Sequence, residues 1–208
     1  MRCRRGATAA EFAMVLPLAL LLLFGIFDTG RYAWDVNQAE KAVQMGARYA
    51  VATALVADGL NSWELADYNT YCGGDLRPGD PVCRAALGQI SCTGTGSGAT
   101  CRCDAAPCPD VGAVNDEAFA AIVARMRYIM PRIAPENVTV RYAGSGLGFA
   151  GDPSVDGDGN PLSDIAPVVT VQVHGLTLRT MTMFGGEIAL PRAASSLTLE
   201  DGDGARAY

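Results

Sequence analysis

The sequence contains very few of the residues on which enzyme sites most often depend. His174 is the one histidine among the 208 residues, so a His-based triad or a histidine-rich metal cluster lacks its parts. No glycine-rich phosphate loop with its lysine is present either. We therefore predict that the protein is not an enzyme and holds no cofactor.

Basic residues are also scarce, and several of them lie at one end of the chain. The sequence has 16 Lys and Arg against 22 Asp and Glu, and Arg2, Arg4 and Arg5 all precede a long apolar run. Without these three, 13 basic residues face the 22 acidic ones, a formal charge of −9. Nucleic-acid binding depends on clustered Lys and Arg that neutralise phosphates. We therefore expect no nucleic-acid partner.

Aromatic residues make up only 7% of a chain that is 50% hydrophobic, so the apolar residues are concentrated in a few stretches. The longest stretch runs without a charged residue from Phe12 to Phe27. About 20 apolar helical residues cross a bilayer, and arginines before the run predict a cytoplasmic N-terminus. The sequence therefore predicts a single-pass protein of the bacterial inner membrane, with a transmembrane helix at residues 7–27 and a periplasmic body.

The start of this run resembles the type IV prepilin signal. The residues that carry the resemblance are Arg4-Arg5-Gly6, then Ala7 to Phe12, then the unbroken apolar helix. In that family a membrane-embedded aspartyl prepilin peptidase cuts after the glycine and leaves a glutamate at the fifth position of the mature chain. The resemblance implies a leader of residues 1–6, processing between Gly6 and Ala7, and an assembly role for Glu11.

The chemistry of Glu11 is consistent with such a role. A carboxylate carried to the bilayer centre costs about 2.5 to 3.5 kcal/mol, so it normally has a partner. Cleavage after Gly6 would expose the α-amino group of Ala7, and the glutamate of one subunit could neutralise that amine in the next. The alternative is an uncleaved anchor in which Glu11 lies at the level of the lipid headgroups.

Residues farther along are similar to the TadE family over about the first 50 residues. They include Pro17 within the apolar run, Gly30-Arg31, and the stretch from Gly46 to Ala50. The resemblance implies a TadE-like minor pseudopilin of the tight-adherence (Flp-type) pilus. Its implied partners are the inner membrane, the prepilin peptidase, other pilins and pseudopilins, and the tight-adherence secretion machine. Two alternatives stay open: an uncleaved single-pass periplasmic adaptor of the same machine, and a membrane-tethered calcium- or ligand-binding module.

Beyond the predicted span, small and apolar residues recur at three- and four-residue spacing. This pattern predicts that the helix continues over residues 28–57 as an amphipathic segment. The recurring residues are Val36, Ala39, Val43, Ala47, Ala50 and Ala54.

Residues 58–111 show little periodicity and hold all the cysteines that processing would leave. An even number of cysteines in a loop-rich periplasmic segment favours disulfides, whose pairing is open among 15 possibilities. Zinc is less favoured, because the spacings do not match a zinc site and no histidine is near. The disulfide candidates are Cys72, Cys83, Cys92, Cys101, Cys103 and Cys108.

Residues 112–208 are predicted to form a small α+β body. Asn115 can cap a helix whose apolar stripe, from Phe119 to Ile129, ends before Pro131. Alternation predicts strands at Val138–Tyr142 and Val169–Val173, and Leu197 and Leu199 suggest a third. The expected fold class is α+β: a long N-terminal transmembrane and amphipathic helix, a small three-stranded antiparallel sheet, one further helix and a Cys-rich loop.

An acidic segment between the first two predicted strands invites a calcium interpretation. It does not fit the EF-hand pattern, because Pro161 stands where that loop needs glycine and Pro167 where it needs its glutamate. A solvated acidic turn is the favoured interpretation, and no metal site is predicted. Asp156, Asp158 and Asn160 are weak calcium candidates, flanked by Asp152 and Asp164.

Overall fold

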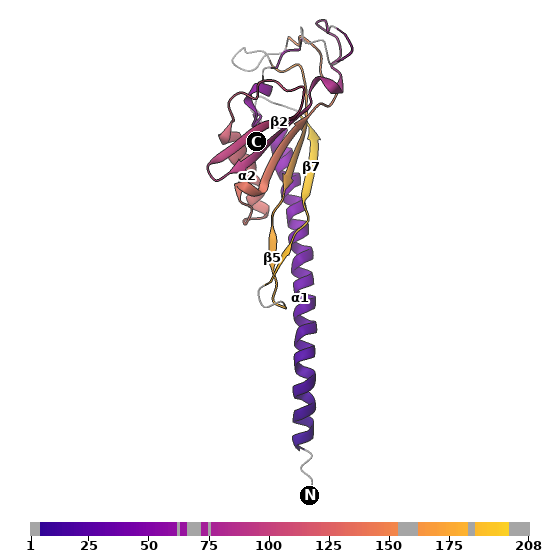
Figure 1. Ribbon diagram of the computed structural model, residues 1–208, viewed down its shortest axis with the longest axis vertical. Helices are drawn as coiled ribbons and strands as arrows, with labels where there is room; N and C mark the ends of the chain where they lie inside the picture. The colour runs from indigo at the N-terminus through magenta and orange to yellow at the C-terminus, as the bar shows by residue number, and fades with distance from the viewer. Residues whose placement is uncertain are drawn as a thin grey trace. The chain divides into compact units, whose positions relative to one another are not determined.

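The computed structural model describes residues 5–61, 63–65, 72–74, 76–153, 162–182 and 186–199. The chain divides into two compact units. The first unit comprises residues 1–37 and 175–191, and the second comprises residues 38–174 and 192–208. One continuous helix, α1 (Arg5–Ala50), contributes its first part to the first unit and its last part to the second (Figure 1).

Besides three short 3-10 helices, the remaining elements among the described residues are one further α-helix and seven strands. They are β1 (Gln89–Thr95), β2 (Gly98–Ala105), α2 (Asp116–Ile129), β3 (Val138–Ala143), β4 (Val168–Val173), β5 (Thr177–Arg179), β6 (Glu187–Ala189) and β7 (Ala193–Thr198).

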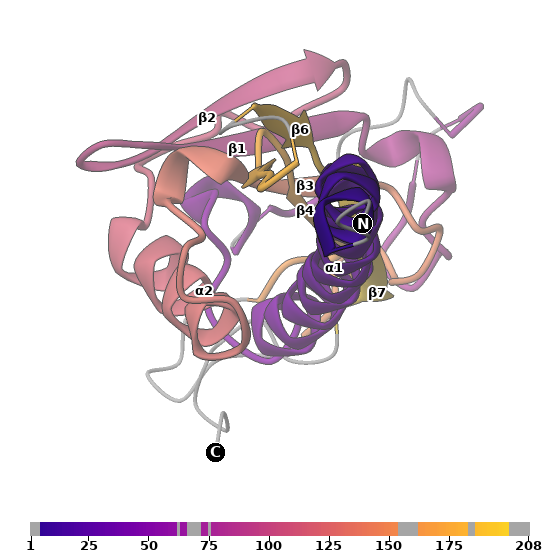
Figure 2. The same cartoon turned by 90° about the horizontal axis from the view of Figure 1, so that it is seen from below.

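The second unit is built on a five-stranded sheet in the order β2-β1-β3-β4-β7, with every neighbouring pair antiparallel. Alternate residues of β3 and β4 point into the core: Val140 lies opposite Val171, and Tyr142 opposite Val169, all fully buried. The last part of α1 and the whole of α2 lie on the same side of this sheet (Figure 2). The core is therefore a layer of helices on one face of an antiparallel sheet.

Gly46 marks the point where the two helices and the sheet come closest. A Cβ atom added at Gly46 would lie 2.8 Å from Cγ of Met126 on α2 and 3.2 Å from Cγ1 of Val171 on β4. Around it, small residues of α1 such as Ala42 and Ala47 are completely buried. Because the side chains of this stretch of α1 are short, the helix can pack closely against α2 and the sheet.

The predicted α+β architecture is confirmed in its main parts, but the number of strands was wrong. The three predicted strands are β3, β4 and β7, which are neighbours in the sheet. The sheet has two more strands, because residues 89–105 of the Cys-rich segment form the hairpin β1–β2. These strands consist largely of Gly, Ser, Thr, Ala and Cys, so their alternation of polar and apolar residues is weak.

The start of α2 agrees with the prediction, whereas the end of α1 differs from it. Asn115 caps α2 as predicted, since its Oδ1 accepts the N–H of Ala118 at 2.9 Å. Helix α1 was expected to reach Ala57 but ends at Ala50. Six residues beyond this end, the buried hydroxyl of Tyr142 accepts the N–H of Val56 at 2.9 Å.

In the first unit, the hairpin β5–β6 lies beside the first part of α1 (Figure 1). Within the described chain, Ala9–Ala50 is the one helical stretch whose length and composition would allow it to cross a membrane, and its most apolar window has no buried residue. A single N-terminal apolar helix fits a single-pass membrane protein.

Candidate assembly segment of the N-terminal helix

The predicted processing and assembly residues lie in the first turns of α1. The backbone from Arg5 onward is helical, so the bond between Gly6 and Ala7 lies inside the helix. Ala7 and Glu11 are four residues apart and therefore occupy the same face, one turn from each other. Glu11 is exposed. A carboxylate at this position is accessible to a charge supplied by another molecule.

The helix beyond Glu11 exposes apolar side chains in every direction. Phe12, Leu18, Leu22 and Ile26 are each well over half exposed. A helix that is apolar all round must be covered by lipid or by other helices. Pro17 lies within the continuous helix and has no N–H to donate, which neighbouring helices or local adjustment can compensate.

The apolar run ends at Asp28, and this carboxylate has a specific structural role. Its oxygens accept the backbone N–H of Met181 at 2.9 Å and the backbone N–H of Thr182 at 2.9 Å. The hydroxyl of Thr182 donates a third hydrogen bond at 2.8 Å. Asp28 is only 6% exposed. The turn that follows β5 is thereby attached to α1.

The side chain of Arg31 completes the surroundings of this carboxylate. Nη1 of Arg31 lies 3.6 Å from Oδ1 of Asp28, and it also donates to the carbonyl oxygen of Arg179 at 3.3 Å. The N–H of Thr182, together with the other donors and the Arg31 charge, holds the pKa of Asp28 below its usual value. Asp28 therefore stays ionised at neutral pH.

Sequence reasoning did not find this attachment. The run from Phe12 to Phe27 identified Asp28 only as the first charge beyond the membrane span. Its partners are more than 150 residues away, in a segment with no recognised strand pattern. One feature of the sequence could have indicated the contact. Asp28 directly follows an apolar helix, and a carboxylate that becomes buried there requires hydrogen-bond donors from elsewhere in the chain.

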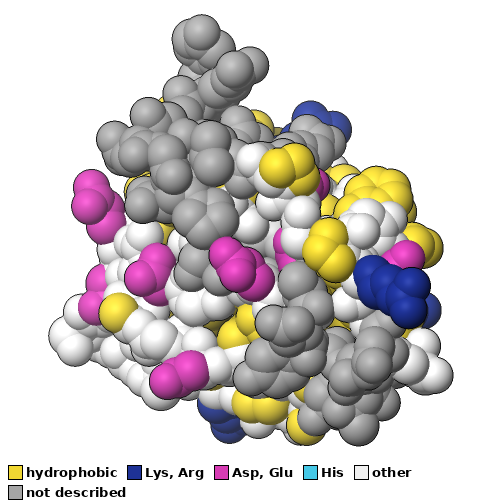
Figure 3. All heavy atoms as spheres, turned by 90° about the horizontal axis from the view of Figure 1, so that it is seen from above, with side chains coloured by type: hydrophobic (Ala, Val, Ile, Leu, Met, Phe, Trp, Pro, Cys, Tyr) yellow, Lys and Arg dark blue, Asp and Glu magenta, His cyan; other side chains and the backbone are white. Residues whose placement is uncertain are grey.

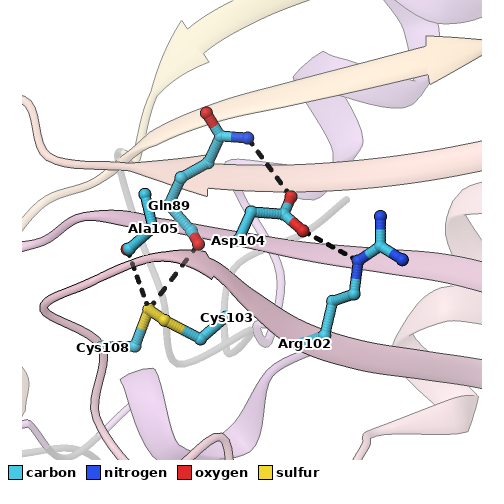
Figure 4. The surroundings of a disulfide bond; sticks show 6 residues. All are labelled: Gln89, Arg102, Cys103, Asp104, Ala105 and Cys108. Carbon is cyan, nitrogen blue, oxygen red and sulfur yellow. Dashed lines mark hydrogen bonds and ion pairs between the residues drawn. A yellow bond between two sulfur atoms is a disulfide. The ribbon is translucent and has the colours of Figure 1, made fainter.

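The six predicted cysteines form three disulfides: Cys72–Cys83, Cys92–Cys101 and Cys103–Cys108. Cys92 and Cys101 are directly opposite each other in the β1–β2 hairpin. The third disulfide closes a short loop after β2 (Figure 4). Beside it, the carboxylate of Asp104 accepts the Nε–H of Arg102 at 2.8 Å and an amide N–H of Gln89 at 3.3 Å. The disulfides thus staple the segment that was predicted to need them.

The acidic loop has a structural use at one end. Asp164 is buried, and its carboxylate accepts the N–H groups of Leu65, Gly151 and Asp152. It therefore holds two loops together. The weak calcium candidates Asp156, Asp158 and Asn160 lie outside the described residues. Within the described part of the chain, no group of three or more His, Cys, Asp or Glu side chains is arranged to hold a metal ion.

His174 lies directly after β4 and is bonded to its neighbours. Its Nε2 is 3.2 Å from the hydroxyl of Thr139, and its carbonyl oxygen accepts an amide N–H of Asn137 at 3.0 Å. These contacts connect His174 to residues at the start of β3. The absence of enzymatic activity stays a prediction.

One end of the second unit is shown as a surface in Figure 3. Acidic side chains are spread over it between apolar and uncharged ones, and Lys and Arg form only small separate spots among the residues described there. This distribution agrees with the net negative charge of the body.

Comparison with known proteins bears on the N-terminal part of the chain. Residues 6–48 match the family described as TadE-like protein. The resemblance seen in the first 50 residues is thereby confirmed. A TadE-like segment suggests a role in Tad pilus assembly and implies association with the machinery that builds the pilus. No curated protein and no solved structure matches the chain.

Proposed function

On the premise that residues 6–48 are a TadE-like segment, we propose that this protein is a minor pseudopilin of the tight-adherence pilus, cleaved between Gly6 and Ala7 by a prepilin peptidase. The match over residues 6–48 is the observation that carries this proposal, because it begins at the glycine of the predicted processing site and includes Glu11 and the whole apolar run.

The exposed chemistry of α1 supports an assembly role. The helix from Phe12 to Phe27 is apolar on every side, so lipid can cover it in the membrane and other pilin helices can cover it in a filament. Glu11 is the one charged residue between Gly6 and Asp28. In a stack of helices, its carboxylate would neutralise the new α-amino group of a neighbouring subunit, which removes two isolated charges from an apolar environment.

The proposed orientation follows from the charges and the cysteines. Arg2, Arg4 and Arg5 place the N-terminus in the cytoplasm by the positive-inside rule. The three disulfides then lie in the oxidising periplasm, where such bonds persist. The reverse orientation would put them in a compartment that keeps thiols reduced.

Replacement of Glu11 in the native host tests this function. We expect Glu11→Ala to reach the membrane but to lose assembly of surface pili, because the incoming α-amine has no carboxylate partner. Glu40→Ala is the matched control, since Glu40 is an exposed acid on the same helix. Pili are counted by electron microscopy and the protein is followed by immunoblot.

Two results would contradict the proposal. Normal piliation by Glu11→Ala would show that the carboxylate has no role in assembly. Normal piliation by a chain that retains its leader, as in Gly6→Ala, would favour the uncleaved periplasmic adaptor instead.

A further inference from the structure

The turn after β5 lies beside the end of the predicted membrane span. Asp28 directly follows the uncharged run, and its carboxylate is hydrogen-bonded to the backbone of Met181 and Thr182. Because these contacts are direct, the turn occupies the same level along α1 as Asp28. That level is the boundary between the hydrocarbon and the headgroups of a bilayer spanned by residues 7–27.

A second contact places part of the turn closer to the bilayer centre. A Cβ atom added at Gly25 would lie 4.0 Å from the methyl carbon of Thr182, so this methyl group packs over Gly25. Gly25 precedes Asp28 by three residues, which is about 4.5 Å along the helix axis at ~1.5 Å per residue. The turn therefore reaches below the first charged residue, alongside the apolar part of the helix.

One exposed apolar side chain after β5 suits a lipid interface. Met181 is 51% exposed, whereas Leu178 is buried. The exposed residues Arg179 and Glu187 lie opposite each other on the strands, on the side of Met181 that faces away from the bilayer centre, where lipid headgroups lie. Trp34 is 66% exposed and lies six residues beyond Asp28, and tryptophan is enriched at membrane–water interfaces.

The polar groups of the turn are compatible with this location. The carboxylate of Asp28 is shielded by its donors, so it does not face lipid as a bare charge. Arg31 is partly exposed beside it, at the level where lipid phosphates lie. The charges of Asp28 and Arg31 are thus compatible with a bilayer interface at this level.

We propose that residues 180–182, which directly follow β5, insert into the periplasmic leaflet of the membrane, so that lipid covers Met181 and this segment fixes the depth of α1. This inference rests on the membrane span in the proposed function. Residues 180–182 would then be a second membrane contact, which must be withdrawn whenever the subunit leaves the bilayer.

Tryptophan quenching by brominated phosphatidylcholine in liposomes tests the insertion in the full-length chain. Trp34→Phe and Trp63→Phe remove both native tryptophans, and single tryptophans are then placed by Met181→Trp, Phe24→Trp or Ala189→Trp. Phe24 reports on the span. Ala189 is exposed at the other end of the hairpin, where it pairs with Thr177.

We expect strong quenching at Phe24→Trp and at Met181→Trp, and roughly twofold weaker quenching at Ala189→Trp. Thr177, the partner of Ala189, precedes Met181 by four residues, which span about 13 Å in an extended chain. Quenching at Phe24→Trp without quenching at Met181→Trp would overturn the insertion and leave the span intact. No quenching at either position would overturn both.

The unmodified chain provides a second measurement that does not depend on a variant folding correctly. Met45 is 38% exposed, less than Met181, so protein burial alone predicts that Met181 is oxidised at least as fast by hydrogen peroxide. Lipid cover reverses this order in liposomes. Faster oxidation of Met181 than of Met45 in liposomes would contradict the insertion.

Discussion

Asp28 accepts hydrogen bonds from both the backbone N–H and the side-chain hydroxyl of Thr182, at 2.9 and 2.8 Å, although 154 residues separate the two. Together with the N–H of Met181, these donors satisfy a carboxylate placed at the end of an apolar helix. The contact joins the N-terminal helix to a hairpin near the other end of the chain. It turns the first charge after the apolar run into a structural anchor.

Removal of this carboxylate should release the hairpin. In Asp28→Ala the N–H groups of Met181 and Thr182 lose their acceptor, so we expect hydrogen exchange in residues 176–182 to be roughly tenfold faster. Exchange is measured by mass spectrometry on the detergent-solubilised chain. Glu40→Ala, an exposed acid on the same helix, should leave these amides unchanged. Equal exchange in both variants would mean that the carboxylate does not hold the turn.

The anchor should also respond to acid in a defined direction. Hydrogen bonds from Thr182 and Met181 lower the pKa of Asp28 below 3.8, so the ionised form is favoured in the folded state. Its stabilisation is present above the unfolded pKa and is lost as pH falls through the lower folded pKa. We expect the exchange difference between wild type and Asp28→Ala to be constant from pH 7 to about 5 and to shrink below about pH 4. A difference that vanishes between pH 7 and 5 would require a raised pKa instead.

Two glycines of α1 should respond oppositely to the same substitution. Gly30→Ala meets no atom within 4 Å, so the alanine should stabilise the helix by up to ~1 kcal/mol. Gly46→Ala gains the same propensity but crowds Met126 and Val171, and overpacking of this kind costs about 1 to 3 kcal/mol. We expect a net loss of about 1 kcal/mol for Gly46→Ala, measured by denaturant unfolding followed by circular dichroism. Stabilisation by both variants would mean that α1 is not packed closely at Gly46.

The features that could be predicted from the sequence are those that depend on residues close together in the chain. The apolar run, the Asn115 cap and the alternation in β3 and β4 are contained within a few residues, and each was predicted. The end of α1 at Ala50 was missed because small apolar residues continue beyond it, and the contacts made there, such as that of Val56 with Tyr142, are with partners far along the chain. Contacts of this kind leave no pattern in the segment that they reshape.

The Cys-rich hairpin shows a signal that was present and overlooked. Gly96 and Ser97 form the two-residue connection between β1 and β2, and such a pair between threonine-containing segments is typical of a hairpin. Cys92 and Cys101 are equidistant from this connection, which makes them cross-strand neighbours. Recognition of the turn would have supplied two strands and one of the three pairings.

The disulfide pairing can be mapped with trypsin alone. Cleavage after Arg48, Arg84, Arg102 and Arg125 gives peptides 49–84, 85–102 and 103–125, each with two cysteines, since Arg77 precedes a proline and resists cleavage. The pairing Cys72–Cys83, Cys92–Cys101 and Cys103–Cys108 places every disulfide within one peptide. We expect three separate peptides under non-reducing conditions, each lighter than its reduced form by two hydrogen atoms.

Any other complete pairing among the 15 would link at least two of these peptides. A cross-linked species that separates on reduction would therefore contradict the observed connectivity. Free thiols throughout would argue against a periplasmic location of the body, because an oxidising compartment would have formed the bonds.

The mass of the N-terminal peptide of the protein, purified from the membranes of its native host, tests the central claim most directly. The account predicts a mature chain that begins at Ala7, with Glu11 as its fifth residue and the apolar helix retained. A chain that still begins at Met1, or one that begins beyond Phe27, would contradict it.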